Sequence, residues 1–168
     1  MGCTHPIEPK LEKRISVHLT HMLTRLSPEA PYLENVRLAE DIVHYSHTLE
    51  IKFDRHTYPW LHNFLVNVGL KERGLCYHYS DALYQYLKQQ YYPHFTFHQA
   101  GANIGEYFYE HNVLVILSSK WSHFEEGIVI DVWREPGNIF ISNVKDDAIY
   151  QWRHRPYREY GYQDHNGR

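Results

Sequence analysis

Apolar residues recur at three- and four-residue steps through the first third of the chain, after a polar lead of residues 1–10. This is the period of an amphipathic α-helix, which turns one apolar stripe toward a core. It predicts a helix that begins near Leu11, a second helix over Tyr32–Leu49 and a short one over Trp60–Val68. Between the first two helices, Ser27-Pro28-Glu29 has the pattern of a helix cap with proline at the first helical position.

A further helix is predicted from about Leu75 to Gln90, and Pro93 ends it. Its apolar face follows the i, i+3, i+4, i+7 rule and consists of Cys76, Tyr79, Leu83, Tyr86 and Leu87. The helix therefore packs on a core, with Cys76 in its first turn. The free N–H groups and partial positive charge of a helix N-terminus stabilise a thiolate, so Cys76 is a candidate nucleophile.

After Pro93, the pattern of apolar residues changes from the helical period to a period of two residues, which is that of a β-strand. Runs of β-branched and aromatic residues, bounded by Gly, Ser, Asn and Pro, predict strands. These runs are Phe95–His98, Glu106–Tyr109, Val113–Leu117, Gly127–Trp133 and Ile139–Val144, with a turn over Glu135-Pro136-Gly137-Asn138. Helices first and an antiparallel sheet afterwards predict an α+β domain.

Length and composition are those of one globular domain, which we assign to residues 11–168, with residues 1–10 as a flexible lead. The formal charge of −3 argues against a nucleic-acid partner, which usually requires a basic patch or stripe. No apolar stretch approaches the ~20 residues that cross a bilayer. Since Cys3 and Cys76 are the only cysteines, a disulfide scaffold is excluded.

The start of the chain, Met1-Gly2-Cys3-Thr4-His5-Pro6, is similar to the end of a bacterial lipobox. In a lipobox the cysteine becomes the lipidated first residue of the mature protein. This similarity predicts a lipid on Cys3 and attachment to a membrane of the bacterial cell envelope. A myristoylation signal is disfavoured, because it requires Ser or Thr where this chain has Pro6. The alternative is an ordinary cytosolic protein in which Cys3 is incidental.

A histidine and an aspartate follow Cys76 on two predicted strands. His111 and Asp131 each lie near the centre of an apolar segment, and a loop over residues 118–126 joins the two segments. Neighbouring antiparallel strands can bring two such side chains face to face. A carboxylate inside an apolar run costs several kcal/mol unless it is paired, so Asp131 requires a partner, and His111 is the candidate. Cysteine, histidine and aspartate are the nucleophile, base and orienting group of a thiol enzyme.

Residues 70–135 resemble the transglutaminase-like branch of the papain-like cysteine enzymes. The resemblance rests on Gly74-Leu75-Cys76 at the start of a helix, His111 on one strand, and Asp131 on the next strand. It implies a papain-like core in which Cys76 is the nucleophile, His111 the base and Asp131 the group that orients it. It also implies an amide substrate, in a peptide, a protein or another molecule, and no cofactor. The family commonly carries an aromatic residue two places after the histidine, where this chain has Val113.

Other residues near the candidate triad leave some roles open. His78 follows Cys76 by two residues and points elsewhere around the helix, so we interpret it as a cleft or surface residue. An oxyanion hole would use the backbone N–H of Cys76 with one side-chain donor, for which Asn67 and Trp60 are both candidates. Hydrolysis and acyl transfer to an amine share the first half-reaction, and the sequence does not decide between them.

Two other classes of function fit the sequence. One is a non-catalytic envelope lipoprotein that uses the same fold to bind a peptide or a protein partner. The other is a metal-binding protein that uses some of the 14 histidines, among which His18 and His21, and His44 and His47, have i, i+3 spacing. We interpret these pairs as solvated helix faces, because no cysteine joins them and no His-Glu-x-x-His motif occurs.

Overall fold

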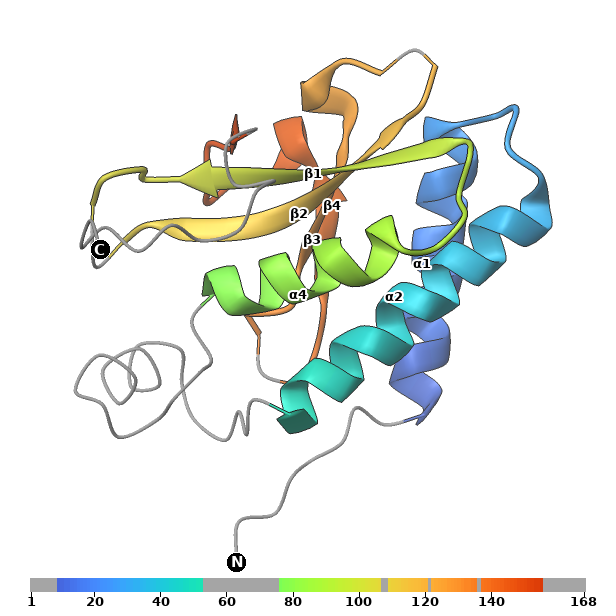
Figure 1. Cartoon of the computed structure of the whole chain (residues 1–168), viewed down its shortest axis with the longest axis horizontal. Helices are drawn as coiled ribbons and strands as arrows, with labels where there is room; N and C mark the ends of the chain where they lie inside the picture. Colours follow the sequence, from blue (N-terminus) through green and yellow to red (C-terminus); the bar gives the residue numbers. More distant parts are fainter. Residues whose placement is uncertain (1–8, 53–75, 107–108, 121, 136, 156–168) are drawn as a thin grey trace, which may run out of the picture.

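The computed structural model describes residues 9–52, 76–106, 109–120, 122–135 and 137–155. In this part of the chain, three α-helices cover one face of a five-stranded antiparallel sheet (Figure 1). The α+β class predicted from the sequence is therefore confirmed. The predicted helix over Trp60–Val68, and Cys3, lie outside the described residues.

The first two helices lie where the apolar periodicity predicts them, but the first begins inside the predicted lead of residues 1–10 and the second continues beyond Leu49. α1 spans Pro9–Leu26 and α2 spans Tyr32–Lys52, and they pack against each other. Each turns one stripe into the core, and the fully buried residues of these stripes include Leu19, Leu23, Leu38, Ile42 and Leu49. Burial of an apolar side chain of this size contributes about 1.5–3 kcal/mol, so packing rather than propensity stabilises these helices.

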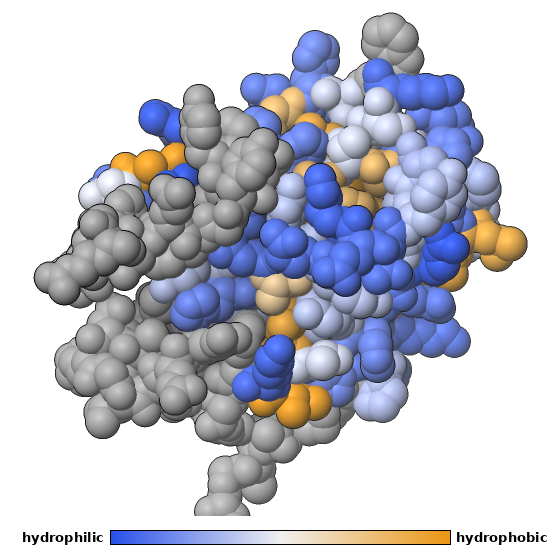
Figure 2. All heavy atoms as spheres, viewed as in Figure 1, coloured by the Kyte–Doolittle hydropathy of each residue, from blue (hydrophilic) through white to orange (hydrophobic). Residues whose placement is uncertain are grey.

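α4 spans Cys76–Lys88 and lies between α2 and the sheet. Its buried residues include Tyr79, Leu83 and Leu87, which the i, i+3, i+4, i+7 rule places on one face. The surface drawn in Figure 2 is mostly hydrophilic, with apolar side chains scattered over it, as expected where helices expose their polar faces. No helix in the described part of the chain is long and apolar enough to cross a membrane.

The segment between α1 and α2 differs from the predicted helix cap. The amide of Ser27 donates to the carbonyl of Leu23 at 2.9 Å, which continues the last turn of α1, and α2 begins only at Tyr32. The buried hydroxyl of Ser27 faces the hydroxyl of Ser118 at 3.2 Å. Ser27 therefore joins the end of α1 to the sheet, and Pro28 lies in a turn instead of a first helical turn.

The sheet is a meander with one added strand. Its strands are β1 (Phe95–Ala102), β2 (His111–Ser118), β3 (Ile128–Asp131), β4 (Phe140–Asn143) and β5 (Arg153–His154). The spatial order is β4-β3-β2-β1-β5, and all four pairs are antiparallel. The loop between β2 and β3 lies where the sequence predicts it.

One strand prediction is wrong, and one strand of the sheet was not predicted. Glu106 and Tyr109 belong to the turn between β1 and β2, where the amides of Tyr109 and Glu110 both donate to the carbonyl of Glu106, at 2.8 and 2.7 Å. These local hydrogen bonds replace the pairing that a strand would need. β5 was not predicted, because two residues are too few to show a period of two.

The two faces of the sheet bury different clusters. Leu114, Ile116, Ile128 and Ile130 pack with the helices, whereas Val113, Val115 and Val129 pack on the opposite face with Trp152. The chain runs along α4, back along β1 and forward again along β2, so α4 and β2 begin at the same end of the sheet (Figure 1). That end carries the candidate site.

Candidate active site

The structure pairs His111 with Asp131. Nε2 of His111 lies 2.7 Å from Oδ2 of Asp131, and both residues are buried, at 4% and 1% exposure. The partner that a buried aspartate requires is therefore the one predicted from the sequence, and this pairing is confirmed. The two residues lie at strand ends and not near strand centres, since His111 begins β2 and Asp131 ends β3.

The register of β2 and β3 explains why these side chains meet. Leu114 lies opposite Ile130, so the position opposite Asp131 is Val113, two residues after His111. Residues two apart in a strand point to the same face, and diagonal neighbours are within reach of long side chains. The imidazole and the carboxylate thus meet on the face turned away from the helices.

Asp131 is held as an anion by four hydrogen bonds. Its Oδ1 accepts the backbone N–H groups of Trp133 at 3.0 Å and Arg134 at 3.1 Å, and its Oδ2 accepts from His111 and from Nε of Arg134. Burial raises the pKa of the Asp131 carboxyl, but the charge and hydrogen bond of His111, with Arg134 and the Trp133 amide, outweigh burial and lower it. The carboxylate is therefore ionised near neutral pH.

The ionised carboxylate determines which ring nitrogen of His111 carries the proton. A carboxylate can only accept, so Nε2 of the neutral imidazole is the protonated nitrogen. Nδ1 then holds the lone pair, and it is the atom that can take a proton from a nucleophile. This arrangement provides an oriented base.

Arg134 links the pair to the segment that follows β4. Its guanidinium donates to both carboxylate oxygens of Asp147, at 3.2 and 2.6 Å, in addition to its bond to Asp131. Desolvation lowers the pKa of Arg134, but hydrogen bonding and charge from Asp147 and Asp131 outweigh it and raise the pKa. Asp147 also accepts from Nε1 of Trp152 at 2.8 Å. The segment is thereby fixed against the end of β3.

This segment brings two aromatic rings against the imidazole. The ring of Tyr150 lies 4.9 Å from that of His111, and the ring of Trp152 lies 5.6 Å from it, measured between centroids. The guanidinium of Arg134 stacks on Tyr150 and, at 3.6 Å, on Phe140. Aromatic packing and the bond to Asp131 together restrict the orientation of the imidazole.

The third predicted residue, Cys76, is the first residue of α4, and its side chain lies outside the described part of the structure. One turn later, Tyr79 and Ser80 line a narrow crevice with Asn112, Asp131 and Trp133. The rings of Tyr79 and Trp133 lie 5.8 Å apart. The first turn of α4 is therefore anchored beside the end of β3 that carries the carboxylate.

The other predicted residues near the triad are His78, Asn67 and Trp60, and the structure describes only His78 among them. His78 is half-buried, with its ring 4.3 Å from that of Tyr77. Asn67 and Trp60, the candidate oxyanion donors, lie outside the described residues. Within the described residues, no group of three or more His, Cys, Asp or Glu side chains could hold a metal ion.

Sequence reasoning missed the residues that surround the pair. Arg134 could have been suspected, because it follows a buried aspartate by three residues, the spacing of a turn that closes on a carboxylate. Asp147, Tyr150 and Trp152 lie in a segment without strand or helix period, so the sequence contained no signal that placed them near His111.

No protein-family model, curated protein or solved structure matches this chain. The assignment of a function therefore depends on the sequence pattern and on the geometry of the site.

Proposed function

We propose that the protein is a papain-like thiol enzyme of the transglutaminase-like type, acting on an amide. Cys76 is the nucleophile, His111 the base, and Asp131 the group that orients the imidazole. The observation that supports this most is the buried contact of 2.7 Å between His111 Nε2 and Asp131 Oδ2, at the end of the sheet where α4 begins.

The proposed reaction begins with transfer of the thiol proton of Cys76 to Nδ1 of His111. The sulfur attacks the carbonyl carbon of the amide, the C–N bond breaks, and the imidazolium returns the proton to the leaving amine. Water or a second amine then attacks the thioester and releases Cys76. Asp131 stabilises the imidazolium while it carries the additional proton.

The energetics of the pair favour a functional role over a purely structural one. Apolar residues of similar volume often stabilise a protein as well as or better than a buried charged group and its partners, so stability alone is a weak reason for the buried carboxylate of Asp131. The carboxylate of Asp131 is also constrained by Arg134 and two backbone amides, which a structural histidine does not require. Rigid support of this kind is typical of catalytic groups.

Because His111 lies on the sheet face away from α4, the thiol and the imidazole would meet around the end of β2. A helix N-terminus at that position favours the thiolate. The proposal therefore predicts a thiol that is reactive near neutral pH and depends on His111.

The test is alkylation of Cys76 by iodoacetamide as a function of pH, in a Cys3→Ser background that leaves one thiol. We expect the rate to reach half its plateau well below the ordinary thiol pKa of about 8.5. His111→Ala should lower the rate near pH 7 about tenfold or more. His123→Ala is the matched control, because His123 is exposed in the loop before β3 and should leave the profile unchanged.

A second measurement tests acyl transfer to the thiol. A burst of nitrophenolate from p-nitrophenyl acetate, lost in Cys76→Ala, is expected if an acyl-enzyme forms. A thiol with an ordinary pH profile, indifferent to His111→Ala, would contradict the enzyme proposal. That result would favour the non-catalytic binding protein that the sequence also permits.

A further inference from the structure

A groove of about 820 Å³ lies between α1 and the edge strand β4, on the helix side of the sheet. Its floor is apolar, and Ile15 and Ile139 are buried there. The half-buried Leu11 and Ile141 complete the floor. Phe140 also borders the groove, but its ring packs under Arg134 on the other face of the sheet. This surface offers apolar contacts to a bound segment.

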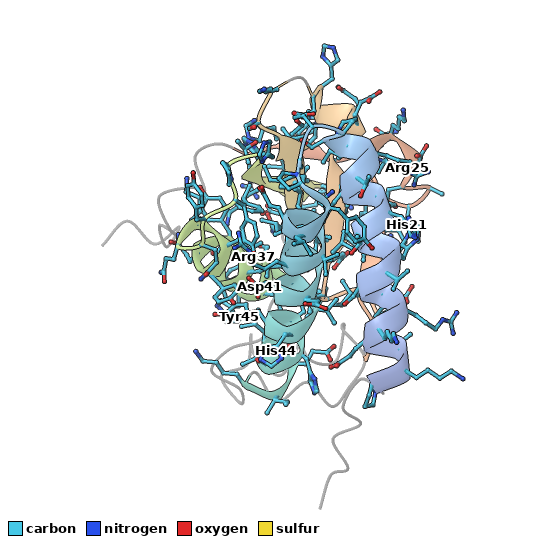
Figure 3. All side chains as sticks on the ribbon, turned by 90° about the vertical axis from the view of Figure 1, so that its right-hand side faces the viewer. His21, Arg25, Arg37, Asp41, His44 and Tyr45 are labelled. Atoms are coloured by element: carbon cyan, nitrogen blue, oxygen red, sulfur yellow. The ribbon has the colours of Figure 1, made fainter. Side chains whose placement is uncertain are left out.

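The rim that α1 contributes to this groove is basic. It consists of Lys10, Lys13, Arg14, His18 and His21, all of them exposed. Within the described residues, none of these side chains forms an ion pair. The single carboxylate of α1, Glu12, is turned to α2, where its Oε1 lies 2.7 Å from Nδ1 of His47. Figure 3 shows that His21 and Arg25 project from α1 on the side away from α2.

The other side of the groove is an open strand edge. In the described sheet β4 pairs only with β3, through residues such as Ile141 opposite Ile130. Along the other edge of an antiparallel strand, alternate N–H and C=O groups point away from the sheet. An extended peptide can satisfy these groups by adding a strand, which is a common mode of peptide recognition.

We propose that the groove between α1 and β4 binds an acidic peptide segment in extended conformation, as an additional strand on β4. The lysine and arginine side chains of this rim select the negative charge, because the described lining of the groove contains a single carboxylate, Glu135. The apolar floor takes alternate side chains of the peptide. This binding site lies on the opposite sheet face from His111 and Asp131, so the proposal goes beyond the acyl chemistry and does not depend on it.

The probe is a fluorescein-labelled peptide of alternating glutamate and valine, titrated with the full chain and followed by fluorescence anisotropy. We expect saturable binding that weakens as salt is added. The double variant Lys13→Glu/Arg14→Glu should weaken binding about tenfold or more, because two attractions become repulsions. The matched control is Lys88→Glu/Lys120→Glu, which reverses two exposed charges outside the groove and should change the affinity little.

Main-chain recognition is tested with two N-methylated versions of the same peptide. One carries the methyl groups on its odd-numbered residues and the other on its even-numbered residues. At least one of the two methylated peptides should lose binding, because its donors to β4 are removed. If both bind as well as the parent peptide, the added strand is contradicted. If the protein binds phosphatidylglycerol vesicles instead of the peptide, or if charge reversal on α1 has no effect, the proposal is overturned.

Discussion

At the scale of single residues, the carboxylate of Asp131 is organised mainly by its own neighbours in sequence. Two of its hydrogen bonds come from the amides of Trp133 and Arg134, in the turn that directly follows β3. Such a turn builds an anion site from local backbone alone. The contact with His111 is the one that joins residues distant in sequence, and it forms because the register of β2 and β3 places the two side chains together.

Arg134 is the residue whose geometry matters more than its charge. Its planar guanidinium reaches Asp131 and both oxygens of Asp147, which a lysine ammonium cannot do at once. Arg134→Lys is therefore expected to lower the free energy of unfolding by about 1–3 kcal/mol, as measured by urea denaturation.

The control for Arg134→Lys is Lys145→Gln. Lys145 and Glu126 form an ion pair of 3.4 Å in which both side chains are more than half exposed. An exposed pair of this kind contributes about 0–1 kcal/mol, so this variant should unfold close to the wild type. If the two substitutions lower the free energy of unfolding equally, the simultaneous bonds of the planar guanidinium to Asp131 and Asp147 do not account for the role of Arg134.

At the scale of elements, the hairpin of β2 and β3 sets the distance between the imidazole and the carboxylate. The loop enters β3 at Gly127, where a Cβ atom would lie 2.6 Å from both Leu117 Cδ2 and Val115 Cγ1. Glycine is required there by this close approach, since its φ of −58° suits any residue. A side chain at this position would force Leu117 and Val115 of β2 to move, so it would strain the hairpin.

Gly127→Ala is expected to destabilise the protein by about 1–3 kcal/mol, because the added methyl group overpacks β2. Thermal unfolding of the variant, compared with Ser119→Ala in the same connection, measures this effect. Ser119 is exposed, so its truncation should change stability by less than about 0.5 kcal/mol. A Gly127→Ala protein as stable as Ser119→Ala would mean that the strands shift apart without cost.

At the scale of the whole molecule, stability depends on buried and half-buried carboxylates that stay ionised. Burial raises the pKa of Asp131, Asp147 and Glu110, but in each case charge and hydrogen bonding outweigh burial and lower it. A lowered pKa in the folded state means that the folded protein binds fewer protons than the unfolded chain. The resulting stability is present above the ordinary carboxyl pKa and is lost as the pH falls below it.

We therefore expect the free energy of unfolding to fall as the pH is lowered below the ordinary values, 3.8 for aspartate and 4.5 for glutamate. Urea denaturation at a series of pH values measures this loss. Asp147→Asn should be less stable at neutral pH and should lose less on acidification, whereas the exposed Asp146→Asn should follow the wild type. Parallel pH curves for Asp147→Asn and wild type would contradict the expectation.

The α+β fold could be predicted from sequence because its long elements have regular periods. The apolar stripes of α1, α2 and α4 and the β-branched runs of β2 and β3 reflect burial against one core. The pairing of His111 with Asp131 could also be predicted, since an aspartate in an apolar strand needs a partner.

The surroundings of the pair could not be predicted, because they depend on where an irregular segment folds back. Tyr150 and Trp152 pack against His111 in a segment that the bond between Asp147 and Arg134 helps to hold, and this bond joins residues on either side of β4. A contact of this kind has no periodic signature. The groove between α1 and β4 could likewise not be predicted from the sequence, since it depends on how α1 lies against the sheet.

The strand order has a consequence for the path of folding. β1, β2, β3 and β4 pair with their neighbours in sequence, whereas β5 returns across the sheet to pair with β1. Closing short loops costs less entropy than closing long ones, so the four-stranded meander is expected to form before β5 docks. The pair of His111 and Asp131 would then assemble with the meander, and the aromatic wall of Tyr150 and Trp152 would close over the imidazole as a late step of folding.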